Sequence, residues 1–239
     1  MKNFLMTIIT GTLNRKNYLT NLVDSIQNHK EIQLVIVDGG SNDGTVEYLS
    51  NLKNPQVKSI FYKKRSSYPH FMNLAIRNAD SDYICQFNDD ALFVTDFNVV
   101  LNSLQKDKVI VFNWKVGTEQ DLTRESWLKG NDNSDNWCIH TSWQENNIEC
   151  SCMNYGIYDK KIFENIGMYY QKYNYYYCDG DMTTRALHFG YEIVAEKDIK
   201  IIIPNIEKKA ILYKSDEILF HKMIKLYSQK MLPSDLDYL

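Results

Sequence analysis

Tyr83-Ile84-Cys85-Gln86-Phe87-Asn88-Asp89-Asp90 is the stretch of sequence that decides the fold. Its first five residues have the composition of a β-strand, and the strand-like run stops at two adjacent carboxylates. Neighbouring carboxylates repel each other, so the arrangement is costly unless a cation, a helix terminus or water compensates for it. Ligands of open α/β sheets bind at the carboxyl edge of the strands. The stretch therefore predicts an acidic site at the edge of a sheet.

The residues around this stretch alternate between strand and helix patterns. Strands are expected at 4–10, 34–37, 57–62, 109–115, 155–158, 193–195 and 199–203. Helices are expected at 19–26, 45–51, 71–76, 160–166, 182–189 and 215–231. Strands joined by helices through short connections imply right-handed βαβ units. The sequence thus predicts an α/β fold with a Rossmann-like, mainly parallel central sheet flanked by helices.

Composition excludes several classes of protein. Hydrophobic residues make up 44% of the 239 residues, which is enough for a sizeable core. The net charge of −3 argues against a nucleic-acid partner, although Lys63-Lys64-Arg65 is free to meet an anionic small molecule. The five cysteines include no CxxC pair, which favours free thiols in a reducing compartment and hence the cytoplasm. No apolar run reaches about 18 residues, so no transmembrane helix is expected.

Asp38 follows a strand-like run and opens the turn Gly39-Gly40-Ser41-Asn42-Asp43-Gly44. One interpretation is turn chemistry alone, because Asp and Gly supply such bends. The other is that Asp38 offers its carboxylate to an N–H group of a ligand at the sheet edge. The loop is not a calcium-binding EF-hand, since its sixth position is Asp43 and its twelfth is Leu49. No GxGxxG follows the first strand, which argues against a dinucleotide site.

The segment from Asp38 to Thr45, DGGSNDGT, resembles the DGGSxDGT segment of GT-A glycosyltransferases, above all the large inverting family 2. Five further segments resemble elements of that family and occur in its order. They are Ile8–Arg15 for the first strand and its T-Y-N-R turn, with Leu13 in place of the usual aromatic; Asn73-Leu74-Ala75; Asn88-Asp89-Asp90 for the DXD motif; Asn154–Gly167; and Asp179–Tyr191. Together the elements span roughly residues 4–203, and they imply the GT-A fold.

The resemblance implies a metal-dependent enzyme that moves a sugar from a nucleoside-diphosphate donor to an acceptor hydroxyl with inversion. It implies Asp90 as a ligand of Mn²⁺ or Mg²⁺, with Asp89 nearer the ribose, while Asn88 in place of the first DXD aspartate weakens ligation there. His221 is a further candidate metal ligand, and otherwise a surface or core histidine. The predicted donor-binding residues are Gly11, Thr12, Leu13, Asp38, Asn73 and Asp89.

An inverting transfer needs a general base near the acceptor hydroxyl. By resemblance this base is Asp179, although the glutamate that precedes it in the family is replaced by Cys178. That departure leaves Asp181 as an alternative base. The non-catalytic interpretation of the two aspartates is that they cap the helix predicted to follow them.

The expected organisation is a glycosyltransferase domain at 1–213 and a helical extension at 214–239. Within the domain, 1–115 is the nucleotide-sugar half and 116–213 the acceptor-side half, with an irregular insertion at 117–148. The expected acceptor is a glycan or a lipid-linked molecule. The terminal helix has an apolar stripe and several lysines, so it either packs on the domain or touches an anionic membrane from the periphery.

Two other functions remain open from the sequence. A sugar nucleotidyltransferase shares the nucleotide-binding architecture, but its triphosphate loop after the first strand would be poorly served by the turn at 11–15. A catalytically silent sugar-nucleotide-binding module is favoured by the departures at Leu13, Asn88 and Cys178.

Overall fold

The computed structural model describes residues 4–117, 137–204 and 213–239. Its strands are β1 (Met6–Thr12), β2 (Ile32–Asp38), β3 (Val57–Phe61), β4 (Tyr83–Gln86), β5 (Leu92–Phe93), β6 (Lys108–Val116), β7 (Thr141–Glu145), β8 (Ile148–Cys152), β9 (Gly156–Asp159) and β10 (Glu192–Ile203). Its helices are α1 (Lys16–Ile26), α2 (Thr45–Asn51), α3 (Tyr68–Arg77), α4 (Phe97–Asn102), α6 (Lys160–Ile166), α7 (Cys178–His188) and α8 (Lys214–Ser228).

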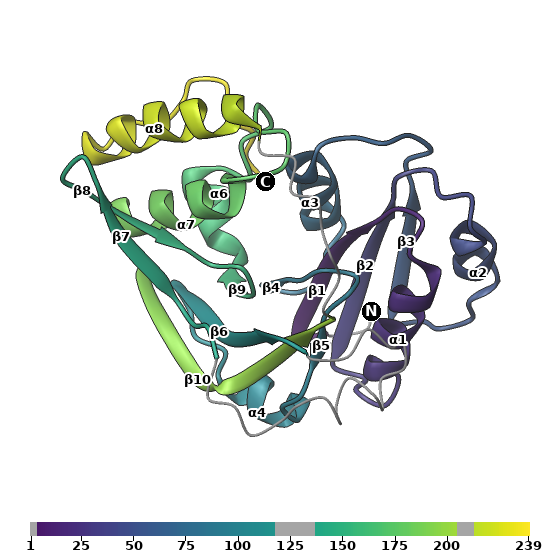
Figure 1. Cartoon of the computed structure of the whole chain (residues 1–239). Helices are drawn as coiled ribbons and strands as arrows, with labels where there is room; N and C mark the ends of the chain where they lie inside the picture. The colour runs from purple at the N-terminus through teal and green to yellow at the C-terminus, as the bar shows by residue number, and fades with distance from the viewer. Residues whose placement is uncertain (1–3, 118–136, 205–212) are drawn as a thin grey trace.

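An eight-stranded sheet in the order β3-β2-β1-β4-β9-β6-β10-β5 forms the centre of the fold, and β7 and β8 form a separate antiparallel hairpin (Figure 1). The pairs β3–β2, β2–β1, β1–β4 and β6–β10 are parallel, whereas β9 and β5 run antiparallel to their neighbours. The α/β fold with a mainly parallel sheet and flanking helices is therefore confirmed. Strands β1, β2 and β4 end at one edge, where the acidic triplet follows β4.

The sheet is buried on both faces because its strands are apolar at consecutive positions. In β1, Ile8 and Ile9 are both fully buried but belong to different apolar clusters, one on each face. In β2, Leu34 and Val35 divide in the same way. One cluster includes α1, and the other includes α3, α6, α7 and α8. The sheet therefore packs between two apolar clusters, and this packing fixes the edge that carries the acidic residues.

The C-terminal helix α8 packs beside α7 (Figure 1). Its buried side chains Phe220, Met223, Ile224 and Tyr227 join the cluster that contains Met182 and Ala186 of α7. The apolar stripe of the terminal helix is therefore used in packing, which leaves Ile218 exposed. Within the described ranges, no helix combines the length and the apolar character needed to cross a membrane.

The structure corrects three local expectations. Helix α7 begins at Cys178 rather than Met182, and its N-cap is Tyr177 with no side-chain capping bond, so neither Asp179 nor Asp181 caps it. The predicted irregular insertion at 117–148 contains β7 and the start of β8, where apolar and polar residues alternate too weakly to predict strands. Its residues 118–136 lie outside the described part of the chain. The strands predicted at 193–195 and 199–203 are one strand, β10, with an irregularity between Glu196 and Lys200.

Candidate functional site

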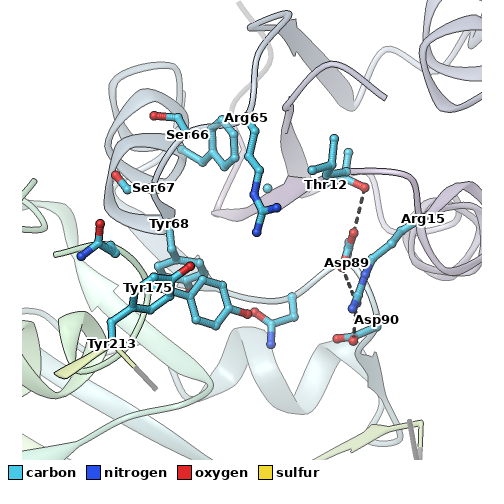
Figure 2. A pocket seen from close by; sticks show the side chains of 15 residues that line it. Thr12, Arg15, Arg65, Ser66, Ser67, Tyr68, Asp89, Asp90, Tyr175 and Tyr213 are labelled. Carbon is cyan, nitrogen blue, oxygen red and sulfur yellow. Dashed lines mark hydrogen bonds and ion pairs between the residues drawn. The ribbon is translucent and has the colours of Figure 1, made fainter. Parts of the chain in front are cut away.

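Asp89 and Asp90 lie at the carboxyl edge of β4 and are almost completely buried. The Arg15 guanidinium contacts both carboxylates: its Nη1 is 3.3 Å from Asp89 Oδ1 and 2.5 Å from Asp90 Oδ2. Thr12 Oγ1 donates a hydrogen bond of 2.8 Å to Asp89 Oδ2. Thr12 is the last residue of β1, which pairs in parallel with β4, and Arg15 is the N-cap residue of α1, in the turn that follows. The cation that the acidic pair requires is thus supplied by the chain itself (Figure 2).

Burial and neighbouring charges have opposing effects on the pKa values of Asp89 and Arg15. Burial is the largest effect on Asp89 and raises its pKa, Arg15 and the Thr12 hydroxyl lower it, and the Asp90 carboxylate raises it, so that the pKa of Asp89 is about 6. Burial also lowers the pKa of Arg15, but Asp89 and Asp90 outweigh this and hold it above its usual value. Arg15 therefore stays charged, and Asp89 titrates close to neutrality.

A cavity of about 400 Å³ opens over the acidic pair. It is lined by Gly11, Thr12, Leu13, Arg15, Arg65, Ser66, Ser67, Tyr68, Phe71, Asn88, Asp89, Asp90, Asn174, Tyr175 and Tyr213. Figure 2 shows the Arg65 side chain pointing into this space. The cavity therefore offers cationic and acidic side chains together, the combination that a diphosphate with a bound cation requires.

Gly40 explains how Arg65 reaches the cavity. Its φ of +91° is a conformation that side-chain-bearing residues rarely adopt, and a Cβ there would lie 2.9 Å from the carbonyl carbon of Lys63. The turn after β2 therefore packs directly against the backbone of the 62–67 loop. Arg65 belongs to this loop, which therefore lies beside the turn after β2.

A second cavity, of about 200 Å³, adjoins the first and contains Asp179. Tyr68, Asn88 and Tyr175 line both cavities, so they form a shared wall. Burial raises the pKa of Asp179, whereas the Gly180 N–H, at 2.9 Å from its Oδ1, and the Cys152 thiol lower it. A carboxylate with a raised pKa at the wall of a cavity is suited to accept a proton.

Asp181 is only two residues away but has different surroundings. Its Oδ1 accepts hydrogen bonds from the hydroxyls of Tyr173 (3.0 Å) and Tyr227 (2.8 Å), and its Oδ2 lies 3.6 Å from Arg185 Nη2. Asp181 and Arg185 are fully buried, and Asp181 lines neither cavity. Its contacts are those of a structural carboxylate that joins α7 to α8.

Comparison with known proteins identifies the family. The family described as Glycosyl transferase family 2 matches residues 7–167, about two thirds of the chain. The chain belongs to glycosyl transferase family 2. An uncharacterized glycosyltransferase of Rickettsia felis is 33% identical over 93 residues, which cover 38% of this chain and 15% of that protein. The abequosyltransferase RfbV of Salmonella typhimurium is 30% identical over 141 residues, covering 54% of this chain and 42% of RfbV.

Solved structures show the GT-A fold. S. aureus TarS 1–349 in complex with UDP superposes with a TM-score of 0.67 at 14% identity, covering 94% of this chain and 65% of TarS 1–349. The mannosyltransferase PcManGT of Pyrobaculum calidifontis, in complex with GDP-Man and Mn²⁺, gives a TM-score of 0.61 at 16% identity, covering 85% and 58% of the two chains. The chain thus spans less than two thirds of the length of each of these relatives.

The structure gathers only some of the predicted site residues. Gly11, Thr12, Leu13, Asp89 and Asp90 line one cavity, and Asp179 lines the adjoining one. Arg15 belongs to a motif found in the sequence and Arg65 to a basic run, but the sequence places neither arginine in the site. Tyr175 belongs to a tyrosine-rich run from 169 to 177, and composition alone does not distinguish a tyrosine that lines a cavity from one in the core.

Three predicted site residues lie elsewhere. Asp38 is buried, and its Oδ2 accepts the N–H groups of Gly40 (2.9 Å) and Ser41 (3.2 Å), so it shapes the turn and does not line the cavity. The Asn73 side-chain amide forms two hydrogen bonds with the backbone of Tyr169: its Nδ2 donates to the carbonyl (2.7 Å), and its Oδ1 accepts the N–H (3.0 Å). His221 lies on α8, with its Nε2 3.6 Å from Glu145 Oε1 of β7, away from the cavity over Asp90.

The acidic pair fits a divalent cation in one particular way. Among the described residues no cluster of three or more His, Cys, Asp or Glu side chains could hold a metal ion. Mg²⁺-type sites, however, commonly use one or two carboxylates together with substrate phosphates and water. Asp90 and Asp89 satisfy that requirement, provided that the Arg15 guanidinium moves off the Asp90 carboxylate.

Proposed function

We propose that this protein is a divalent-cation-dependent, inverting glycosyltransferase that moves a sugar from a nucleoside-diphosphate donor to an acceptor hydroxyl. The observation that carries the proposal is the pair of adjoining cavities. One holds the acidic pair with Arg15 and Arg65, and the other holds Asp179. In this proposal the donor occupies the first cavity and the acceptor the second, so the sugar to be transferred lies at the wall between them.

The donor side supplies charge to the leaving group. Arg65 points into the cavity and is placed to bind a diphosphate oxygen by charge-assisted hydrogen bonds. Asp90, with Asp89 beside it, would hold Mn²⁺ or Mg²⁺, which when bound neutralises the diphosphate as it departs. Arg15, released from Asp90, remains close enough to the same space to pair with a phosphate. The mannosyltransferase PcManGT, which resembles this chain in fold, was solved with GDP-Man and Mn²⁺.

The acceptor side supplies the base. Asp179 takes the proton of the attacking hydroxyl as the oxygen bonds to the anomeric carbon and the diphosphate leaves. Its raised pKa suits this role, because a base with a pKa nearer to the working pH holds the proton more strongly. Inversion follows if the hydroxyl attacks from the side opposite the diphosphate, which two cavities on either side of one wall permit. A glycan or a lipid-linked molecule is the proposed acceptor.

A second candidate is sugar-nucleotide binding without a metal ion and without turnover. The ion pairs of Arg15 with Asp89 and Asp90 favour it, since they already offset part of the negative charge of the pair. The two candidates differ in what Mn²⁺ does to donor binding.

The test is a thermal-shift screen of UDP- and GDP-sugars with and without MnCl₂, followed by transfer and hydrolysis assays. A ligand that binds the folded state alone raises the melting temperature by mass action. We expect a shift that needs Mn²⁺, and its loss together with activity in Asp90→Ala. Asp179→Asn should keep the shift and lose transfer. A metal-independent shift without turnover would select the second candidate, and full activity in both variants would refute the first.

A further inference from the structure

The wall between the two cavities depends on a residue from the last helix. Segment 174–176 belongs to this wall, because Tyr175 lines both cavities and Asn174 and Tyr176 line one each. Tyr175 is 51% exposed, so it is open to a ligand in either cavity. Its ring meets Tyr68 edge-on at 5.8 Å, so the two rings stand together between donor and acceptor space.

Asp216 holds this segment. It lies in the first turn of α8, is only 1% exposed, and directs both carboxylate oxygens at segment 174–176. Its Oδ2 accepts the backbone N–H groups of Tyr175 (2.9 Å) and Tyr176 (3.1 Å). Its Oδ1 accepts the backbone N–H of Asn174 (3.0 Å) and the Asn174 side-chain amide (2.8 Å). Three consecutive backbone donors thus converge on one buried carboxylate.

The segment is also held from the other side and under backbone strain. The Tyr68 N–H at the start of α3 donates to the Asn174 carbonyl at 3.1 Å. Tyr177, which follows the segment and caps α7, has a φ of +64°, a conformation that is unfavourable for a residue with a side chain. A strained residue persists only where its surroundings fix it, and the contacts of Asp216 supply that fixation directly before Asp179.

We propose that Asp216 is a positioning residue, which holds segment 174–176 so that Tyr175 forms the wall shared by the donor and acceptor cavities. Asp216 itself lines neither cavity, so it acts only through the segment. Its effect on catalysis rests on the proposed glycosyltransferase function, whereas its effect on the segment does not. The sugar-facing group in this arrangement is the Tyr175 ring, whose aromatic face is suited to stack on a sugar ring.

The test uses the full chain with Asp216→Asn and, as a matched control, Glu217→Gln, which changes the adjacent exposed carboxylate. The first measurement is hydrogen exchange. In Asp216→Asn we expect the amides of 174–176 to exchange at least about ten-fold faster, while those of α7 keep their protection. Unchanged exchange at 174–176, or a rise throughout α7, would overturn the proposal. If Asp216→Asn fails to unfold cooperatively, Asp216→Glu, which keeps the charge, replaces it in the same comparison.

The second measurement is a double-mutant cycle on the binding of UDP-sugars and of GDP-sugars, each with MnCl₂, because Tyr175 faces the sugar. Asp216→Asn should weaken binding about ten-fold when Tyr175 is present and less than about two-fold in the Tyr175→Ala background, because the two residues act as one unit. Equal losses in both backgrounds would overturn the proposal. If the unaltered protein binds none of these nucleotide sugars, the proposed function fails, and the exchange measurement still decides the role of Asp216.

Discussion

Asp179 and Asp181 are two residues apart on α7, and replacing each with alanine should have opposite consequences. Asp181→Ala removes the acceptor of two buried tyrosine hydroxyls, at about 1–3 kcal/mol each, and the counter-charge of the fully buried Arg185. Removing one partner of a buried ion pair costs about 3–5 kcal/mol, and contributions that share one carboxylate do not add. Burial nevertheless raises the pKa of Asp181, so desolvation offsets part of these contacts. We therefore expect a loss of about 3 kcal/mol.

For a chain of this length such a loss lowers the melting temperature by about 6–12 °C. Asp179→Ala removes two contacts, to the Gly180 N–H and to the Cys152 thiol, and no ion pair, so its melting temperature should fall by less than about 4 °C. Its transfer rate should fall by about 10²–10⁴ because it loses the base. Asp181→Ala, assayed well below its own melting temperature, should keep transfer within about ten-fold of the unaltered protein.

The assay is differential scanning calorimetry together with transfer kinetics at 20 °C for both variants. The reasoning would be refuted by the converse result, in which Asp181→Ala is as stable as the unaltered protein and inactive while Asp179→Ala retains transfer. Asp181 would then be the base, and its contacts with Tyr173 and Tyr227 would serve to orient it. Loss of stability in both variants would show that the first turn of α7 responds as one unit.

Two further predictions concern the charged groups of the site. Arg15→Gln removes the cation that competes for Asp90, so Mn²⁺ binding without donor, measured by electron paramagnetic resonance, should tighten about ten-fold; unchanged affinity would mean that Arg15 and Mn²⁺ do not compete. Cys152→Ala removes a hydrogen bond that lowers the pKa of Asp179, and since the base acts deprotonated, activity is lost as the pH falls through that pKa. The acidic limb of the kcat/KM profile should therefore move to higher pH in Cys152→Ala and stay in place in Cys152→Ser, and an unmoved limb in both would remove Cys152 from the site.

The fold could be predicted because its signals are local. Buried parallel strands are apolar at consecutive positions, and each strand near the site ends in a polar turn, so alternation of strands and helices already indicates the sheet. The position of Asp89 and Asp90 at the sheet edge follows from the same pattern. Element ends were less predictable, as at α7, where Asp179 and Asp181 resemble residues ahead of a helix but lie in its first turn.

The site was less predictable because its chemistry depends on contacts between distant residues. Asp38 and Asn73 have the right composition for ligand binding, yet their hydrogen bonds are taken up by a turn and by the backbone of Tyr169. Arg15 lies beside Asp90 through the pairing of β1 with β4, which a sequence shows only as two separate motifs. Asp216 is about forty residues from the segment it holds, and in sequence it is simply an acidic residue near the start of a helix.

The C-terminal helix is better understood as part of the active unit than as an extension of it. Division of the chain at residue 213 remains a prediction, but α8 shares an apolar cluster with α7 and gives it two buried polar links. Tyr227 donates to Asp181 in the first turn of α7, and Asp216 holds segment 174–176, which precedes the N-cap residue Tyr177. Because the two links flank Asp179 in sequence, α8 fixes the candidate base from both sides without touching it. Loss of α8 would therefore disturb both the wall and the position of Asp179. Yet of the described residues that line the donor cavity, only Tyr213 comes from residues 205–239.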